Sequence, residues 1–434
     1  MDEISSKQDL INYFEKGCKK ENRLSIGVEH EKFIFNNLTK QRVNFETVSK
    51  IFNFLEQFGW KPIKEKNYVI GLSREGQNIT LEPGNQIELS GSKLNSVHSN
   101  CSESYKYLYE LRKACKKLNL KMMSVSFDPF TKLENVPPTP KQRYEIMTKE
   151  MLNDGKLSLH MMYQTCGTQI NLDYISEKDF IKKFKLSTFL VPISIAIFAN
   201  SPIVENSLSG YLSYRSKVWQ HTSRAGLPKI FLEDMNFEKY IDFAINMPLL
   251  FVIKNSKHLS PERKKFKDFM DGKLSILKNI KPNILDFKNH LATIFTEIRL
   301  KKYIEIRSLD TCEWDCHCGG PAFYVGLLYG NLNEAFDIIN KWKASDVLNA
   351  YVDAPKKGLN TILNNKTLLE WGKIFLNLSK KGLEKRSLKN DSGKDESIFL
   401  RSIESIINNN KTKADITIEK FKNNKDLSFL YEKT

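Results

Sequence analysis

The chain has 434 residues, of which 41% are hydrophobic and 11% aromatic, so it is long enough to bury a substantial core. Its charged fraction of 27% and mean hydropathy of -0.43 are typical of a globular protein and exclude an intrinsically disordered chain. The net charge of +16 comes with lysines spread along every segment, without an arginine-rich arm, a zinc finger or an aromatic RNA motif, so we expect no nucleic-acid partner.

Two features of the sequence predict a cytoplasmic location and no membrane partner. No stretch approaches the roughly 18 uninterrupted apolar residues of a membrane span, and the most apolar segment, 189–199, has the length of a core helix. The N-terminus, from Met1 to Ser6, is acidic and polar and lacks the apolar segment of a signal peptide.

The first part of the chain mixes helical and strand-like patterns. Apolar residues at helical spacing predict helices in residues 1–22, 41–59 and 96–120. Alternating or short apolar runs predict strands in residues 23–35, 69–72, 79–89 and 122–127. The third of these strands contains Pro83 and Gly84 and must turn or bulge there. A proline-rich loop at 137–140 precedes a helix that begins at Arg143.

The mixture continues to the end of the chain. Strands are predicted in residues 164–173 and 249–253 and as a hairpin in 294–306. Helices are predicted in residues 177–199, within 208–221 and from 322 onward, with a flexible polar connection at 385–396.

Because the strands do not alternate regularly with helices, a doubly wound parallel sheet is excluded. We predict an α+β fold with one mostly antiparallel sheet. Residues 1–434 are expected to form a single unit, in which a helical part (331–434) packs on a sheet-bearing core (1–330).

Two carboxylates, Glu29 and Glu31, lie in the strand predicted at 23–35. Because residues two apart share one face of a strand, both side chains project together while Val28 and His30 face the other way. Adjacent carboxylates in a half-buried strand repel each other and stay ionised only if a cation neutralises them. Taken alone, the pair fits a solvated strand face equally well.

Three further carboxylates lie in apolar, strand-like sequence. Glu82 and Glu88 share a face if their strand is continuous, although Pro-Gly between them weakens this argument. Glu305 and Arg307 share a face of the next hairpin. Five such carboxylates are too many for surface decoration, and hard oxygen ligands without a Cys/His set indicate magnesium or manganese.

Magnesium held by carboxylates usually binds phosphates as well. The chain has no Walker-type loop, because residues 71–76 lack the required lysine and spacing. A nucleotide would therefore be held by metals and arginines on a sheet. Carboxylate–amine ligases, which form an acyl phosphate and let an amine displace it, work in this way.

Eight motifs follow in order between residues 24 and 330. They occupy residues 27–33, 81–91, 140–147, 165–173, 199–202, 214–219, 303–307 and 321–329. The first reads Gly-Val-Glu-His-Glu-Lys-Phe and the seventh Tyr-Ile-Glu-Ile-Arg. Together they resemble the plant and proteobacterial type of glutamate–cysteine ligase, within the glutamine synthetase-like superfamily.

The resemblance implies a funnel-shaped antiparallel sheet, similar to that of glutamine synthetase, with metal ions on it. The positions that match its metal-binding carboxylates are Glu29, Glu31, Glu82, Glu88 and Glu305. Glu305 would also be catalytic, through its neighbour Arg307.

The same resemblance assigns roles to residues that hold the nucleotide and substrates. Gln169 matches a further polar or metal-binding position beside the nucleotide, and Arg143 and Arg215 match substrate-binding arginines. Arg307 would bind the nucleotide and stabilise the transferring phosphoryl group, since a guanidinium binds phosphate or carboxylate with two parallel bonds. For Arg299 a functional role and a surface position both stay open.

The reaction implied by the resemblance is ATP-dependent ligation of the glutamate γ-carboxylate to the cysteine amine through γ-glutamyl phosphate, the first step of glutathione synthesis. Its cofactor would be Mg²⁺ or Mn²⁺, and its partners the small molecules glutamate, cysteine and ATP. Two alternatives stay open: a glutamate ligase that uses a different amine, and a non-enzymatic basic binding protein. A monomer and a redox-dependent homodimer are both compatible with the sequence.

Seven cysteines in a chain expected to be cytoplasmic predict thiols rather than a framework of bridges. The segment 312–318 holds three cysteines and a histidine, but its spacing does not fit a common zinc site. By the resemblance, Cys101 and Cys318 match one regulatory disulfide of plant members, so a bridge and two thiols both stay open there. The second plant pair has no counterpart, because no cysteine lies near Ser260 or Ser275.

Overall fold

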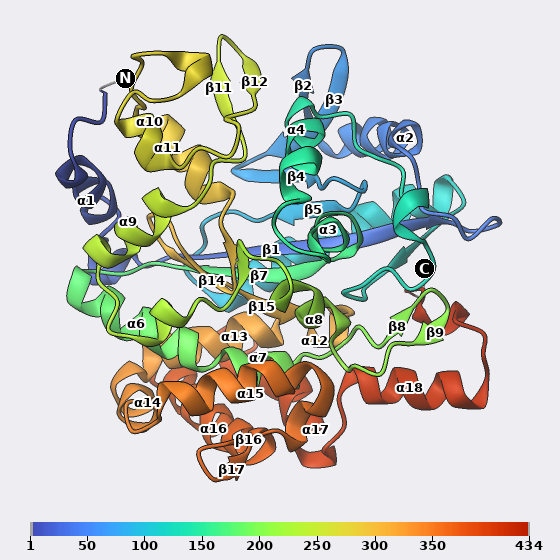
Figure 1. Ribbon diagram of the computed structural model, residues 1–434. Coiled ribbons are helices and arrows are strands. Elements are labelled where there is room, and N and C mark those ends of the chain that lie inside the picture. Colours follow the sequence, from blue (N-terminus) through green and yellow to red (C-terminus); the bar gives the residue numbers. More distant parts are fainter. Residues whose placement is uncertain (1–2, 433–434) are drawn as a thin grey trace.

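The computed structural model describes residues 3–432 and is built around one nine-stranded sheet (Figure 1). Its strand order is β14-β15-β7-β1-β5-β4-β3-β2, and β6 pairs with the second half of β1. All of these pairs are antiparallel. The predicted α+β class with a mainly antiparallel sheet is therefore confirmed.

The strands of this sheet come from the first three quarters of the chain. They are β1 (Ile26–Asn36), β2 (Lys61–Glu65), β3 (Tyr68–Arg74), β4 (Gln77–Leu81), β5 (Ile87–Ser90), β6 (Leu120–Met123), β7 (Gly167–Leu172), β14 (Ile298–Leu300) and β15 (Ile304–Asp310). Four short pairs lie outside it: β8 (Ile203–Val204) with β9 (Ser207–Leu208), β10 (Ala225–Gly226) with β13 (Phe295–Thr296), β11 (Val252–Lys254) with β12 (Lys257–Leu259), and β16 (Ile362–Leu363) with β17 (Lys366–Thr367).

Helices cover both faces of the sheet (Figure 1). Those below it in this view include α6 (Glu177–Phe189), α7 (Val191–Ile197), α13 (Gly319–Val325), α14 (Leu332–Ile339), α15 (Ala344–Lys357), α16 (Leu368–Arg386) and α17 (Arg401–Asn409). Those above or beside it include α1 (Lys7–Glu15), α2 (Phe45–Leu55), α3 (Val97–Lys117), α4 (Gln142–Met151), α9 (Phe237–Asn246), α10 (Phe266–Met270) and α11 (Ile284–Ala292). The remaining α-helices are α5 (Ser158–Gln164), α8 (Tyr214–Gln220), α12 (Trp314–His317) and α18 (Lys413–Asn423).

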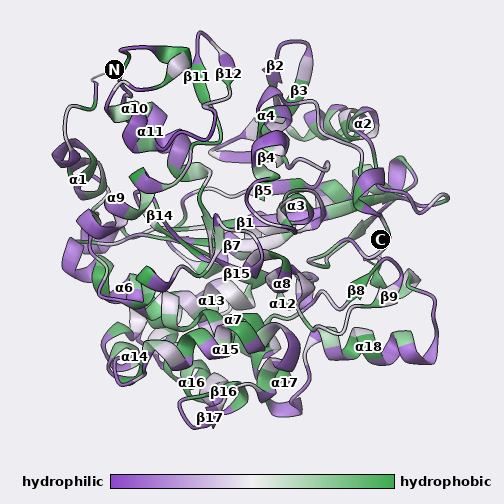
Figure 2. Ribbon diagram, viewed as in Figure 1, coloured by the Kyte–Doolittle hydropathy of each residue, from purple (hydrophilic) through white to green (hydrophobic). Residues whose placement is uncertain are grey.

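The alternation of the strands decides which face is apolar. Val28 and Ile170 are fully or almost fully buried and pack with helical residues such as Leu327 and Phe375 in the largest core cluster. Figure 2 shows hydrophobic residues along the strands and the helices beneath them, whereas the outer loops are hydrophilic. This cluster contains residues from both sides of residue 330. The division into a sheet-bearing core (1–330) and a helical part (331–434) stays a prediction.

A second core cluster lies at the end of the sheet formed by β3 and β4. It includes Ile51 and Phe52 of α2, Leu108 of α3, and Leu72 and Ile79 of β3 and β4. Helix α3 begins at Ser96, whose hydroxyl accepts a hydrogen bond from the Ser99 amide, as a helix N-cap does. Within residues 3–432 no helix is both long and apolar enough to cross a membrane.

Several predicted elements differ from the observed ones. The strand predicted at 79–89 is two strands, β4 and β5, because Glu82–Gln86 form the turn between them. Strand β2 was not predicted, since Lys61–Glu65 contains a proline and three charges. The helix predicted at 177–199 is divided between α6 and α7, with Pro192 in the first turn of α7.

The connection predicted to be flexible, 385–396, is anchored at its end. Glu396 is 0% exposed, accepts a hydrogen bond from the Val97 amide at 2.6 Å and pairs with Arg386 at 2.9 Å. A carboxylate at the first turn of α3 also stabilises that helix terminus. The ends of this segment are therefore held in place, while the flexibility predicted for its middle stays a prediction.

Candidate active site

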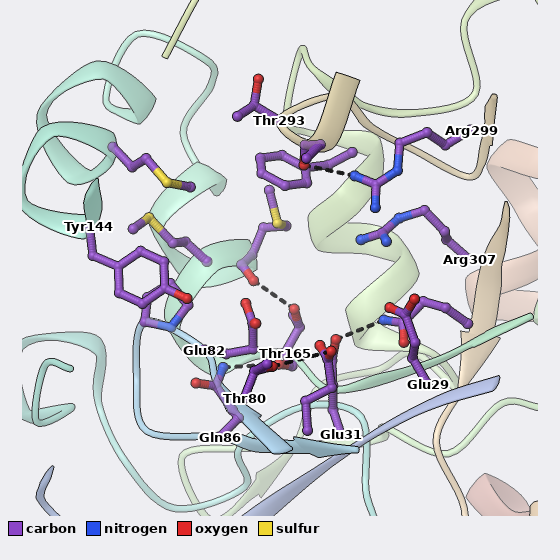
Figure 3. A pocket seen from close by; sticks show the side chains of 18 of the residues that line it. Glu29, Glu31, Thr80, Glu82, Gln86, Tyr144, Thr165, Thr293, Arg299 and Arg307 are labelled. Carbon is purple, nitrogen blue, oxygen red and sulfur yellow. Dashed lines mark hydrogen bonds between the residues drawn. The ribbon is translucent and has the colours of Figure 1, made fainter. Parts of the chain in front are cut away.

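The upper face of the sheet forms the floor of a cavity of about 330 Å³. Figure 3 shows Glu29, Glu31 and Glu82 pointing into it, with Tyr144 on one side and Arg299 and Arg307 on the other. Glu88 lines it as well. We call Glu29, Glu31, Glu82 and Glu88 the acidic floor.

Strand register brings the floor carboxylates together. Glu31 on β1 lies directly opposite Glu88 on β5, and Glu29 lies opposite Ser90. As predicted, Val28 and His30 face the other side, where both are buried. Like charges directly opposite each other destabilise an antiparallel pair, so this register is costly without a compensating cation.

Burial and mutual repulsion raise the pKa of three floor carboxylates, Glu29, Glu31 and Glu88. Burial, together with Glu305 and Glu88, raises the pKa of Glu29 to about 7. Burial, together with Glu88 and Glu82, raises the pKa of Glu31 to about 8. Burial and Glu82 raise the pKa of Glu88, against the hydrogen bond that Ser90 Oγ donates to it at 2.6 Å. A divalent cation would allow all of these groups to ionise.

Two amides on β7 hold the floor carboxylates and each keeps an oxygen free. Gln169 donates to Glu31 at 2.7 Å, and Asn171 donates to Glu29 at 2.9 Å. Among residues 3–432, nothing donates a hydrogen bond to Gln169 Oε1 or Asn171 Oδ1, although both atoms are buried. Such orphaned oxygens cost about 1–3 kcal/mol unless a donor or a cation satisfies them. Carboxylate and amide oxygens together fit Mg²⁺ or Mn²⁺.

The described part of the chain contains no group of three or more His, Cys, Asp or Glu side chains already gathered to hold a metal ion. The floor carboxylates line one cavity from β1, β5 and the turn between β4 and β5, without forming such a group.

A cationic wall stands at the β14–β15 side of the floor. We define it as Arg299, Lys301 and Arg307 around Glu305. Arg299 binds Glu305 with two bonds, at 2.6 and 3.0 Å, Lys301 pairs with it at 2.9 Å, and Arg307 donates to the same carboxylate.

The cationic wall lowers the pKa of Glu305, whereas the pKa values of Glu29, Glu31 and Glu88 in the floor are raised. Burial opposes the ionisation of Glu305, but Arg299, Lys301 and Arg307 hold its pKa well below the usual range. Both Glu305 oxygens accept from these cations. The structure thus places Glu305 as a counter-ion of the wall, while its predicted metal-binding role stays a prediction. Arg299, left open by the sequence, is 5% exposed and lines the cavity.

The predicted arginines occupy different places. Arg143 lines the cavity beside Tyr144, to whose hydroxyl it donates at 3.0 Å, and this Tyr144 contact together with Glu82 raises its pKa. Arg307 lines the cavity from β15.

Arg215 on α8 does not line the cavity. It is 1% exposed, stacks on Trp219 at 4.1 Å and donates to the Arg307 carbonyl at 2.7 Å. Its Nε and Nη1 have no hydrogen-bond partner within the described residues. The structure therefore places Arg215 behind Trp219, where it supports β15, and its predicted contact with substrate stays a prediction.

Sequence reasoning missed the apolar end of the cavity. Its lining includes Met147, Met161, Met162, Trp219 and Phe251, all of which are buried. They come from α4, α5, α8 and the segment before β11, so no single motif brings them together. Methionine and aromatic side chains adapt to small polarisable groups such as a thiol.

The expectation of free thiols is wrong for Cys312 and Cys316, and of the two alternatives left open for Cys101 and Cys318 the structure has the bridge. Disulfides join Cys101 to Cys318 and Cys312 to Cys316. The first links α3 to the N-terminus of α13 across 217 residues. Cys18, Cys115 and Cys166 are free thiols.

An acidic floor beside a cationic wall on an antiparallel sheet fits one class of protein, the phosphoryl-transferring ligases without a Walker loop. Comparison with known proteins gives the family. The model of glutamate-cysteine ligase family 2 (GCS2) matches residues 25–432, and the chain belongs to this family.

The chain is similar along most of its length to plant enzymes of this name. It is 40% identical over 421 residues to the chloroplastic glutamate–cysteine ligase B of Oryza sativa subsp. japonica, covering 96% of this chain and 84% of the relative. It is 38% identical over 420 residues to the chloroplastic enzyme of Nicotiana tabacum, covering 95% and 79%.

A solved structure supports the fold. A Francisella tularensis glutamate–cysteine ligase in complex with AMP aligns with a TM-score of 0.52 at 13% identity, covering 95% of this chain and 87% of that one. At this identity the likeness shows the fold alone.

The prediction of a cytoplasmic location is contradicted by these relatives. The plant enzymes are named chloroplastic, so the comparisons do not support a cytoplasmic location. The prediction rested on the polarity of the first residues, and that feature does not determine the compartment.

Proposed function

We propose that the protein joins the γ-carboxylate of glutamate to the amine of cysteine while ATP is converted to ADP and phosphate, giving γ-glutamylcysteine, the first step of glutathione synthesis. The observation that carries this proposal is the acidic floor directly beside the cationic wall, in a chain of the glutamate–cysteine ligase family. The reaction would pass through an acyl phosphate, γ-glutamyl phosphate. To form it, the site must bring together two anions, the phosphates of ATP and the γ-carboxylate of glutamate.

Mg²⁺ or Mn²⁺ would be held by the acidic floor, with the orphaned oxygen of Gln169 as a further ligand. When bound, it neutralises the ATP phosphates and the glutamate γ-carboxylate, which otherwise repel each other. Glu29, Glu31 and Glu88 respond by releasing their protons, because the cation lowers the raised pKa values of these groups.

Arg307 and Arg299 would face the transferring phosphoryl group. Their charges are fixed in place by Glu305, so they need no reorganisation when negative charge moves toward the γ-carboxylate oxygen. Glu305 is thereby a positioning residue for Arg307.

Arg143 would bind the α-carboxylate of glutamate at the other end of the cavity, near Tyr144. The thiol side chain of cysteine would then lie against Met147, Met161 and Phe251. Its neutral amine attacks the acyl phosphate and phosphate leaves, so no protein nucleophile is required.

Two finer parts of the proposal concern shape and assembly. We include the funnel-shaped, glutamine synthetase-like form of the sheet, which the antiparallel order and the position of the cavity support. We also include a monomer or a redox-dependent homodimer as the working form, with Cys101–Cys318 as the relevant bridge.

A coupled assay of ADP release tests the function. Glutamate and MgATP are held constant while the amine is cysteine, serine, glycine, alanine or 2-aminobutyrate, and products are identified by mass spectrometry. Release that needs both glutamate and cysteine supports the proposal. A stronger response to another amine indicates a different acceptor, and a basic binding protein would release no ADP with any of them.

A further inference from the structure

A second cavity, of about 310 Å³, adjoins the catalytic cavity. Its lining includes five lysines, Lys19, Lys93, Lys288, Lys301 and Lys302, which we call the lysine basin. Lys301 and Ala292 line both cavities, so the basin continues from the cationic wall.

The five lysines come from four separate places in the chain. Lys19 follows α1, Lys93 follows β5, Lys288 lies on α11, and Lys301 and Lys302 form the turn between β14 and β15. The fold therefore assembles this concentration of positive charge from segments that show no lysine motif.

Within the described residues, only Lys301 of the five lysines has an acidic partner, Glu305 at 2.9 Å, and Lys19 donates to the Gly17 carbonyl at 2.9 Å. Asp173 is the one carboxylate that lines the basin, and it accepts hydrogen bonds from the Ser25 amide and hydroxyl at 2.9 and 2.6 Å. Within residues 3–432, Lys93 and Lys288 form no hydrogen bond or ion pair, and Lys302 contacts only the ring of Tyr13, at 5.2 Å.

The lysines also act on one another. Burial, and then Lys288, Lys19, Lys16 and Lys93, lower the pKa of Lys302. Five cations gathered around one cavity repel each other, and an anion with several charges is the ligand that relieves this repulsion.

Phosphate groups fit both the lysine basin and the cationic wall that continues from it. Lysines bind phosphates as mobile point charges, whereas the arginines of the wall bind in a fixed planar geometry. A chain of phosphates could thus lie on the lysines at one end and reach the arginines and the acidic floor at the other.

We propose that the lysine basin binds the phosphates of a nucleoside triphosphate next to the transferred one, and so directs its terminal phosphoryl group along Lys301 to the cationic wall. This inference rests on the proposed function, because it places the ATP of that reaction. The basin residues Lys19, Lys93, Lys288 and Lys302 are binding and positioning residues with no part in the chemical step.

The first test compares two double variants that remove equal charge. Lys288→Gln with Lys302→Gln changes the basin, whereas Lys264→Gln with Lys267→Gln changes exposed lysines before and on α10, outside it. We expect the KM for MgATP to rise about tenfold in the basin variant alone, since each lost charge-assisted bond weakens phosphate binding severalfold. The KM for glutamate should stay unchanged in both. Equal MgATP KM values in the two variants would overturn the proposal.

A second test needs no turnover and so separates this inference from the proposed function. Calorimetric titration with ADP and with inorganic tripolyphosphate should show binding about tenfold weaker in the basin variant than in the control, at equal melting temperature. If wild type releases no ADP with glutamate and cysteine, the function fails while this titration still tests the basin.

The same two variants also show whether the basin binds the phosphates of a nucleotide or a separate phosphate anion. If the basin variant loses affinity for inorganic phosphate but keeps wild-type KM for MgATP and wild-type affinity for ADP, the basin holds a separate phosphate anion. That result would overturn the nucleotide assignment.

Discussion

Glu31 and Glu305 lie in strands of one sheet, Glu31 lining the cavity and Glu305 paired with the arginines that line it, and they are in opposite electrostatic states. Glu31 lies opposite another carboxylate, and its pKa is raised to about 8. Glu305 lies opposite Arg299, and its pKa is held well below the usual range. The wall carries its own counter-charges, whereas the floor lacks them. Only the floor therefore needs an external cation, and this difference separates the proposed metal site from the proposed phosphoryl-binding site.

The largest expected effect comes from removing the carboxylate that the wall surrounds. Glu305→Gln leaves three buried or half-buried cations without their shared partner, which should lower the free energy of unfolding by about 3–5 kcal/mol. Urea denaturation without magnesium measures this. Glu31→Gln removes a like-charge contact instead and should leave stability equal or raise it by up to about 1 kcal/mol. Equal losses in both variants would contradict the contrast between wall and floor.

The next effect concerns activity. Glu88→Gln should lower ADP release at limiting magnesium by about 100-fold, because it removes a floor ligand while the wall stays intact. A magnesium titration of the coupled assay measures the loss and the raised requirement for the ion. Glu46→Gln, on the exposed side of α2, is the control with the same change of charge. Wild-type activity in Glu88→Gln would remove this residue from the metal site.

A smaller effect should follow from changing the hydroxyl that supports Glu88. Ser90→Ala deletes a 2.6 Å hydrogen bond to Glu88 and should weaken Mg²⁺ affinity about tenfold. Thr80→Ala removes a longer bond, 3.3 Å, to the same oxygen and should weaken it less. The magnesium dependence of ADP release ranks the two variants, and the reverse ranking would show that these hydroxyls do not act through Glu88.

The pH dependence of stability provides the mildest test. Folded Glu29 and Glu31 have pKa values of about 7 and 8, above the usual 4.5, so the folded state binds more protons than the unfolded chain between about pH 4.5 and 8. The metal-free protein should therefore lose stability as pH rises through this window. Saturating Mg²⁺ should cancel the loss, as thermal melting at several pH values would show. A metal-free stability that rises with pH would contradict the assignment.

The sequence predicted all four carboxylates of the acidic floor, but the structural reason was correct only for Glu29 and Glu31. Glu29 and Glu31 share a face because β1 is a continuous strand, as expected. Glu82 and Glu88 both reach the cavity, but through the turn of a hairpin and not through equal spacing on one strand. The Pro-Gly pair between them was the signal for this turn.

The rest of the site could not be predicted because it depends on tertiary contacts, which are close in sequence for Arg299 and join distant segments for Arg215. The burial of Arg299 follows from the carbonyls of Ala292 and Ile294 that accept its hydrogen bonds. The position of Arg215 behind Trp219 follows from where α8 meets β15. Neither contact leaves a periodic pattern in the sequence.

Direct binding of Mn²⁺ to the nucleotide-free protein, followed by the enhancement of water proton relaxation, tests most directly whether the acidic floor is the metal site. The double variant Glu31→Gln with Glu88→Gln is compared with Glu46→Gln and Glu56→Gln, which removes two carboxylates at α2 outside the cavity. Binding that is retained in the α2 variant and lost in the floor variant is the predicted result. Equal Mn²⁺ affinity in the two variants would contradict the account.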